Sequence, residues 1–130
     1  MATWDELHQI AMSLPEVSEK TDWKGIRQWR VKDKLMVWER PLRRSDFEAL
    51  GASAPDGPIL GARVPDVGAK EALLADGGEI FFTTPHFDGY PAILVQLDNV
   101  SIGELEELVV EAWLTQAPKR LSSDWLAAEE

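Results

Sequence analysis

Side chains that can exchange protons or hydrogen bonds gather in one short stretch, residues 84–91. A histidine, a carboxylate and a phenol stand there among prolines and a glycine: Thr84, Pro85, His86, Phe87, Asp88, Gly89, Tyr90 and Pro91. As a binding site, the stretch would present His86 and Tyr90 as donors and acceptors on a turn stiffened by its prolines. As architecture, the same side chains would bond nearby carbonyls and hold a wide connection between two strands. Both interpretations stay open, because loops serve both purposes.

Catalysis by His86 would need a partner within hydrogen-bond reach and a group to orient it. Asp88 is close in sequence, but a separation of two residues is common in turns, and no serine lies in a nucleophile elbow. The other histidine, His8, falls on a predicted helix. Two distant histidines and scattered carboxylates lack the ligand spacing of a metal site, and Gly77-Gly78 is not followed by the Lys-Ser/Thr of a phosphate loop. The sequence therefore predicts no enzyme, no metal site and no cofactor.

A second group of candidates lies in residues 20–44, where nine basic side chains stand against three acidic ones. This block carries a formal charge of +6, although the whole chain carries −10. Lys and Arg contact phosphates, and tryptophans stack on bases. A nucleic-acid hypothesis assigns stacking to Trp38, with Trp23 as a second stacking residue, and phosphate contacts to Lys24, Arg27, Arg30, Lys32, Lys34, Arg43 and Arg44. The alternative is that these bases form a solvated face or pair with the chain's own acids.

Apolar periodicity and capping residues predict the elements that position these groups. Two capping boxes, Thr3 with Glu6 and Ser101 with Glu104, open a first and a last long helix. Weaker helical signals lie at Ser45–Leu50, from Asp66 through Ala75, and after Pro118; strands are expected around Trp29–Val31, Leu35–Trp38, Ile59–Val64, Ile80–Thr83 and Ala92–Leu97. The order α-βββ-α-ββ-α(α) predicts a two-layer α+β domain, in which helices pack on one face of a five-stranded antiparallel sheet. Residues 39–58 form a long connection, which in a compact domain is often functional.

The first two strands form a predicted hairpin whose register the sequence leaves open. A three-residue loop over Lys32-Asp33-Lys34 would turn one set of side chains inward (Trp29, Val31, Leu35 and Val37) and another outward (Arg30, Met36 and Trp38). A two-residue loop would mix the two faces. Exposure of Trp38, and hence its ability to stack, depends on this register.

Composition limits the class of protein. The 130 residues, 45% apolar and 28% charged, are those of one ordinary globular domain spanning residues 1–130. No apolar run approaches the roughly 20 residues that a bilayer crossing needs. Acids occupy the N-terminus where a secretory signal would have bases, so we expect a cytoplasmic protein without a membrane partner. The absence of cysteine excludes disulfides and thiolate chemistry.

Several segments resemble the MmcQ/YjbR-like family of small bacterial proteins. They are Ser13-Leu14-Pro15-Glu16-Val17, Trp29-Arg30-Val31, Arg63-Val64-Pro65, the stretch from Phe81 through Pro91, and the end from Ala112-Trp113 through Ala117-Pro118-Lys119-Arg120-Leu121. They span nearly the whole chain in the family's order. The resemblance implies a secretion-chaperone-like α+β fold with a curved antiparallel sheet. It also brings the family's usual description, a DNA-binding protein.

These observations favour a non-enzymatic binding module, a monomer or weak dimer. The leading hypothesis is weak, salt-dependent binding of nucleic acid through residues 20–44. A rival hypothesis is a protein-interaction or chaperone-like adaptor, which would use an exposed sheet surface or a patch around Trp38. A third is a small-molecule site beside His86, Tyr90 and Arg120.

Overall fold

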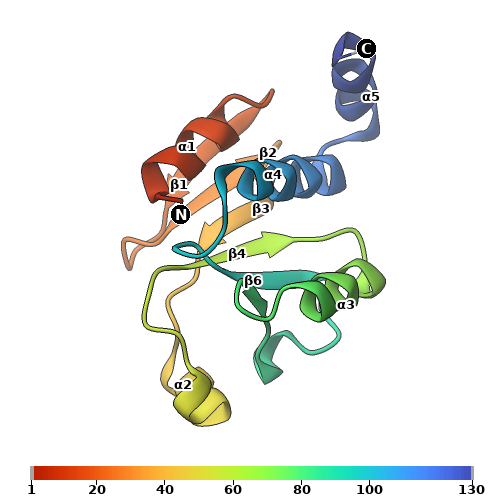
Figure 1. Ribbon diagram of the computed structural model, residues 1–130. Coiled ribbons are helices and arrows are strands. Elements are labelled where there is room, and N and C mark those ends of the chain that lie inside the picture. The colour runs from red at the N-terminus through yellow and green to blue at the C-terminus, as the bar shows by residue number, and fades with distance from the viewer. Residues whose placement is uncertain (1, 130) are drawn as a thin grey trace.

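One antiparallel sheet of six strands runs through the computed structural model, which describes residues 2–129 (Figure 1). The strands are β1 (Val17–Thr21), β2 (Arg27–Val31), β3 (Lys34–Glu39), β4 (Ile59–Arg63), β5 (Phe81–Phe82) and β6 (Ala92–Gln96). Across the sheet their order is β1-β2-β3-β4-β6-β5, and every neighbouring pair is antiparallel. The predicted α+β class with an antiparallel sheet is confirmed.

The predicted count of five strands, and with it the predicted order, was wrong because it omitted β1. This strand lies at an edge of the sheet and pairs only with β2. Val17 is half-buried and the four residues after it are exposed, so the strand shows no apolar alternation. Edge strands often carry such polar side chains, since neither of their faces has to enter the core. The alternation rule therefore could not detect it.

Five helices accompany the sheet in the part of the chain that the structure describes: α1 (Trp4–Met12), α2 (Arg44–Leu50), α3 (Val67–Asp76), α4 (Ile102–Gln116) and α5 (Lys119–Glu129). Both predicted capping boxes are present, at the starts of α1 and α4. Asp66 caps α3 by accepting from the backbone N–H of Ala69 at 2.8 Å. Within residues 2–129, no helix has the length and apolar character that a membrane crossing requires.

The main core lies between the sheet and helices α1 and α4, with α3 at its margin (Figure 1). Trp29, Leu60, Ile93, Leu105 and Trp113 are fully buried in it. The two indoles also satisfy their polar edges. Trp113 Nε1 donates to the carbonyl of Pro15 at 3.0 Å and Trp29 Nε1 to Nδ1 of His8 at 3.1 Å. The sequence analysis expected helices to pack on one face of the sheet, and α1 and α4 pack on this face.

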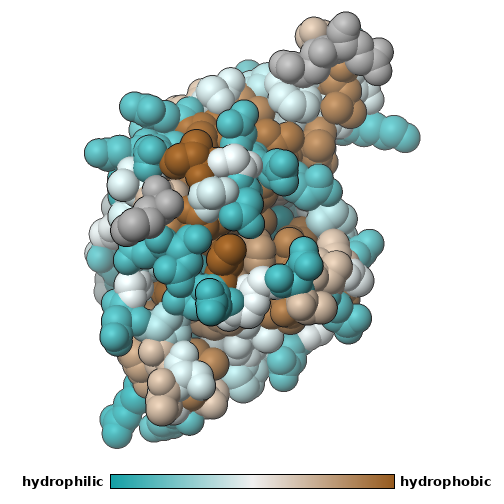
Figure 2. All heavy atoms as spheres, in the orientation of Figure 1, coloured by the Kyte–Doolittle hydropathy of each residue, from teal (hydrophilic) through white to brown (hydrophobic). Residues whose placement is uncertain are grey.

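Helix α5 stands away from the body of the molecule at the C-terminal end (Figure 1). Trp125 holds it to α4, with its ring centroid 5.2 Å from that of Trp113. Leu126 on the same helix is 47% exposed, and apolar side chains reach the surface along α5 (Figure 2).

The β2–β3 hairpin turns on two residues, Lys32 and Asp33, both with positive φ (48° and 69°). Positive φ at both central residues is the geometry of a type I′ turn, which usually carries Asn-Gly, so Lys-Asp gave a weak signal. An irregularity between Trp29 and Arg30 then pairs Arg30 with Leu35 and Trp29 with Val37. The skipped residue of β3 shifts the alternation of its side chains.

Of the two loops that the sequence left open, the structure has the two-residue loop, and the faces of β3 are mixed. Met36 and Val37 both enter the main core, whereas Leu35 faces the other side of the sheet with Trp38. Trp38 is only 9% exposed. It is therefore not the open stacking platform that an outward-facing position would give.

A second, smaller apolar cluster covers the face of the sheet opposite the core helices. It consists of Trp38, Ile59, Phe87, Ala92 and Leu94. No long helix packs over it; its neighbours are the segments that carry α2 and residues 84–91 (Figure 1). The cluster leaves room for the groove described next.

Candidate functional site

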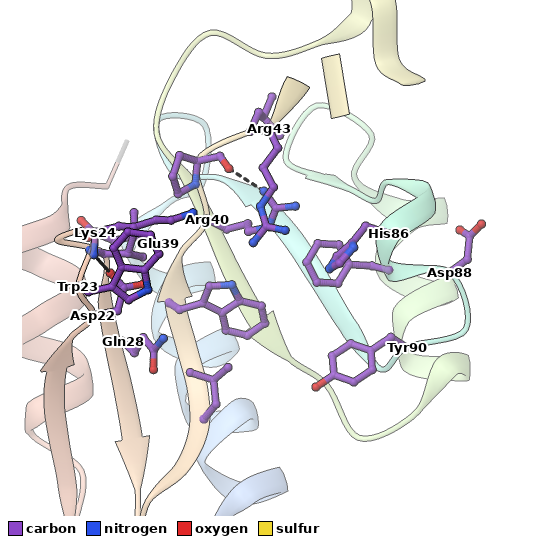
Figure 3. A pocket seen from close by; sticks show the side chains of 16 residues that line it. Asp22, Trp23, Lys24, Gln28, Glu39, Arg40, Arg43, His86, Asp88 and Tyr90 are labelled. Carbon is purple, nitrogen blue, oxygen red and sulfur yellow. Dashed lines mark hydrogen bonds between the residues drawn. The ribbon is translucent and has the colours of Figure 1, made fainter. Parts of the chain in front are cut away.

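A groove of about 840 Å³ lies on the face of the sheet that the core helices leave uncovered. Its lining comes from the β1–β2 turn, from β3 and the segment after it, and from the stretch 84–91: Asp22, Trp23, Lys24, Ile26, Gln28, Leu35, Trp38, Glu39, Arg40, Pro41, Leu42, Arg43, His86, Phe87, Asp88 and Tyr90. Trp23 and Lys24 stand at one end, His86 and Tyr90 at the other, and Arg40 and Arg43 between them (Figure 3). The fold thus joins the basic block to the stretch 84–91, which lie far apart in the sequence.

Gly61 fixes Trp38 in this wall. A Cβ atom at Gly61 would lie 2.4 Å from the Trp38 ring, so only glycine lets the indole lie flat on β4. The exposed aromatic surface is instead Trp23, which is 89% exposed. The ammonium of Lys24 lies 5.0 Å from the centroid of its ring.

The most unusual group in the groove is a buried ion pair between Arg40 and Asp46. Their side chains are 5% and 2% exposed, and Arg40 Nη1 lies 3.0 Å from Asp46 Oδ2. Nη1 also donates to the carbonyl of Pro41 at 2.6 Å, and the guanidinium carbon lies 5.3 Å from the centroid of the Phe87 ring. Arg40 Nη2 is buried and has no hydrogen-bond partner.

Burial and charge act in different ways on the two members of this pair. Burial lowers the pKa of Arg40, and the Asp46 charge opposes that effect. Burial would raise the pKa of Asp46, but its pKa is lowered, because the anion accepts from the backbone N–H of Arg43 at 2.8 Å and faces Arg40. Both groups are therefore charged at neutral pH, and together they join α2 to the groove.

The stretch 84–91 is held by side chains from outside it. Buried Lys70 on α3 donates to the carbonyls of Phe87 and Tyr90 at 2.5 and 3.1 Å, and burial lowers the pKa of its ammonium. Arg63 Nε donates to the carbonyl of Pro91 at 3.2 Å, and its Nη1 donates to the Tyr90 hydroxyl at 3.1 Å. These bonds support the architectural interpretation through donors to which the sequence analysis gave no role in this stretch.

Some residues of the stretch are buried or fix its backbone, and others are exposed. Thr84 is buried, Pro85 opens a 3-10 turn (Pro85–Phe87), Gly89 has a φ of 73°, and Pro91 is half-buried. His86, Asp88 and Tyr90 are exposed. The Asp88 carboxylate points away from His86 (Figure 3), and among residues 2–129 no hydrogen bond or ion pair joins them. Asp88 therefore does not orient His86 as the partner of a general base.

The groove includes only part of the predicted set of phosphate contacts. Only Lys24 and Arg43 line the groove; Arg27, Arg30, Lys32, Lys34 and Arg44 do not. Arg27 pairs with Glu39 at 3.0 Å, Lys32 with Glu16 at 3.1 Å and Arg44 with Glu48 at 3.7 Å, while Arg30 donates to Gln28 and to the carbonyl of Asp33. Arg120 lies in the first turn of α5 and is also absent from the lining.

The sequence analysis missed Arg40, Asp46, Lys70 and Arg63 as site residues. A signal existed for Lys70, which shares a helical face with the core contacts Leu73 and Leu74 at spacings of three and four. Arg40 lies in an irregular segment and Asp46 in the short helix α2, and no apolar period marks either residue as buried.

An antiparallel sheet with its long helices on one face and a groove on the other defines a small α+β protein with a candidate binding site in that groove. The family model of YjbR matches residues 12–115, and the chain belongs to this family. Uncharacterized proteins of Mycobacterium bovis and Mycobacterium tuberculosis are 52% identical over 130 residues, which cover 98% of this chain and 98% of each relative. The resemblance stated from the sequence is confirmed.

A solved structure supports the fold. The crystal structure of a Deinococcus radiodurans protein with a DUF419 domain superposes with a TM-score of 0.68 and 18% identity, and covers 95% of this chain and 88% of that one. At this identity the likeness concerns the fold alone.

Proposed function

We propose that this protein is a cytoplasmic, non-enzymatic binding protein that takes a short single-stranded segment of nucleic acid into the groove. One observation carries the proposal: the groove places exposed aromatic rings at both ends of a pair of arginines (Figure 3). Aromatic rings stack on unpaired bases, and guanidinium groups contact the phosphates between them. Trp23 and Tyr90 are the exposed rings, and Arg43 lies between them.

The size of the groove favours a short single strand over a duplex. Its volume of about 840 Å³ falls in the range of ligand sites, roughly 300–1,000 Å³. The hairpin cations that could follow a longer backbone are mostly engaged with the protein's own acids. We therefore assign the contacts to Trp23, Lys24, Arg43 and Tyr90, and not to the hairpin.

This assignment makes the salt dependence quantitative. Lys24 and Arg43 line the groove and take part in no ion pair within residues 2–129. Each phosphate contact to a single strand contributes about −0.7 to the slope of log K against log salt, so two give about −1.4. Binding through all seven predicted cations would give a slope several times steeper.

Fluorescence anisotropy with a short labelled oligonucleotide over a salt series tests the proposal. Trp23→Ala removes an exposed ring and should weaken binding by about 1–3 kcal/mol, the cost of losing one stacked base. The matched control is Arg30→Glu with Lys32→Glu on the hairpin, which changes the charge more but leaves the groove intact. Binding that survives Trp23→Ala and disappears in the hairpin variant would move the site to the hairpin. A wild-type protein that binds no oligonucleotide would refute the function.

A protein-interaction adaptor, in keeping with the secretion-chaperone-like fold that the family resemblance implies, is the second candidate. Phe47 on α2 is 50% exposed beside a smaller hollow that Leu42, Pro55 and Ile59 line. An apolar contact there should persist at salt concentrations that remove phosphate contacts. Partner binding that is insensitive to salt and lost in Phe47→Ser would favour this candidate.

A further inference from the structure

We propose that Arg40 and Arg43 form a phosphate subsite in the groove, and that this subsite takes the terminal phosphate monoester of the bound strand. The inference rests on the proposed function and specifies which end group the groove recognises. Three features carry it: an unpartnered buried donor, a second guanidinium directed toward it, and the limited access to both.

The unpartnered donor is Arg40 Nη2. The other terminal nitrogen of this side chain is engaged by Asp46 and by the carbonyl of Pro41, but Nη2 is buried without an acceptor. A buried donor with no partner costs about 1–3 kcal/mol, and more when it is charged. An acceptor oxygen supplied by a ligand would remove that cost. Because Arg40 lines the groove, the ligand that enters there is the natural source of the oxygen.

The second guanidinium belongs to Arg43. Its backbone N–H is fixed by Asp46 at 2.8 Å, and its side chain reaches toward Arg40 (Figure 3). Burial is the main reason that the pKa of Arg40 is lowered, and the positive charge of Arg43 lowers it further. Asp46 compensates one of the two positive charges, which leaves the other for an anion. Two guanidinium forks can bind several oxygens of one phosphate.

Access to Arg40 favours a terminal phosphate over an internal one. The Arg40 side chain is 5% exposed, and it lies between the two ends of the groove (Figure 3). A phosphodiester carries a sugar on both sides, whereas a monoester presents three oxygens and a charge of about −1.5 to −2 at its free end. The small end group can approach a recessed donor, and the first base then meets the ring at one end of the groove.

The experiment compares one oligonucleotide with a 5′-phosphate, with a 3′-phosphate and with neither, by anisotropy at constant salt. One phosphorylated form should bind about tenfold more tightly or better, the effect of a charge-assisted hydrogen bond. Arg43→Ala should abolish this preference. Arg44→Ala, its matched control, removes the same charge from a neighbouring side chain that is 95% exposed and outside the groove, and should retain it.

A second variant tests Arg40 without leaving an ion unpaired. The double substitution Arg40→Gln with Asp46→Asn replaces the ion pair by two amides and keeps the net charge of the protein unchanged. This variant should bind the oligonucleotides with a 5′-phosphate, with a 3′-phosphate and with neither equally. Should it fail to fold, as judged by thermal unfolding, Arg43→Ala decides the question by itself.

The outcomes separate the subsite from the function. Equal binding of all three oligonucleotides overturns the terminal-phosphate subsite and leaves nucleic-acid binding intact. If a nucleoside monophosphate binds in an Arg43-dependent way and no oligonucleotide binds, the nucleic-acid function fails and the subsite stands. Absence of binding by both kinds of ligand overturns both.

Discussion

The two faces of the sheet bury different kinds of side chain. Under α1 and α4 the buried residues are apolar, and the only polar edges among the largest of them are indoles with hydrogen-bond partners. The polar or charged side chains buried within residues 2–128 are Arg40, which lines the groove, Asp46, which pairs with it, and Lys70 and Thr84, which hold or belong to the stretch 84–91. Three of these four carry ionisable groups.

This difference distinguishes the buried apolar side chains that stabilise the fold from the buried ions beside the groove. Apolar burial stabilises the covered face at about 25 cal/mol per Å². Burying ions costs free energy that pairing only partly returns, so an apolar replacement of equal volume is often as stable. Ions that persist in such a place are candidates for function. The candidate site therefore lies on the face where burial of side chains contributes less to the free energy of unfolding.

The largest effect is expected for Asp46→Ala. The substitution leaves Arg40 buried without its carboxylate, which should cost about 3–5 kcal/mol of unfolding free energy. This loss is as large as the loss expected for a large truncation on the covered face. Leu105→Ala, for example, should cost about 2–5 kcal/mol of unfolding free energy. Chemical denaturation measures both. The control is Asp56→Ala, which removes an exposed acid from the same connection, and a loss equal to that control would erase the contrast between the two faces.

The same carboxyl predicts how stability depends on acid. The pKa of folded Asp46 lies below its ordinary value of 3.8, so the unfolded chain takes up the proton first as the pH falls. The stability that Asp46 contributes is therefore present above about pH 4 and is lost as the pH falls through the lowered pKa. Asp46→Asn should lack this component, which the difference between the two stability–pH curves isolates.

A smaller effect is expected where the groove wall rests on the sheet. Gly61→Ala puts a methyl group 2.4 Å from the Trp38 ring, and overpacking of this kind costs about 1–3 kcal/mol. The emission of Trp38 should change as the ring is displaced. Gly103→Ala is the opposite control: nothing lies within 4 Å of its Cβ position on α4, so it should stabilise by up to about 1 kcal/mol. Equal behaviour of the two variants would contradict the close packing.

Lys70→Met tests how the stretch 84–91 is held. Methionine keeps the length of the side chain but removes both hydrogen bonds to the loop carbonyls, a loss of about 1–3 kcal/mol. Hydrogen exchange should accelerate at Phe87 and Tyr90 and stay unchanged in β2. Uniform acceleration would show instead that Lys70 stabilises the whole domain.

The smallest effect is expected for Lys32→Ala at the hairpin turn. Its ion pair with Glu16 is about half exposed on both sides, at 53% and 50%, and such pairs contribute about 0–1 kcal/mol. Denaturation should show almost no change, and oligonucleotide affinity should stay at the wild-type value. A large loss of affinity would return the hairpin to the candidate site.

Local patterns predicted the parts of the fold that depend on neighbours in sequence. The capping boxes at Thr3 and Ser101 and the apolar strands from Ile59 and Ala92 are found as expected. Non-local pairing decided the rest. The exposed strand β1 exists because β2 offers it a partner. The orientation of Trp38 follows from the irregularity between Trp29 and Arg30, which no local sequence pattern marks.

The site was predictable only in pieces. His86, Tyr90, Lys24 and Arg43 could be chosen by residue type, but no spacing indicated that they share one groove. Arg40 lies in irregular backbone and Asp46, six residues later, lies in the short helix α2. Charged residues in such a connection are ordinarily solvated. Only the packing of Phe87 beneath the guanidinium shows why this pair is buried.

The connection between β3 and β4 can change in length without changing the pairing of the sheet. The backbone N–H of Arg40 donates to the carbonyl of Ile59 at 2.9 Å, so the segment that carries Arg43 and α2 leaves the sheet and returns to it at adjacent positions. For a segment closed in this way, doubling the length costs only about 0.6 kcal/mol of loop entropy. Insertions within residues 51–53, which are exposed and lie outside the Arg40–Asp46 pair, should therefore be tolerated, and new contacts could be engineered there.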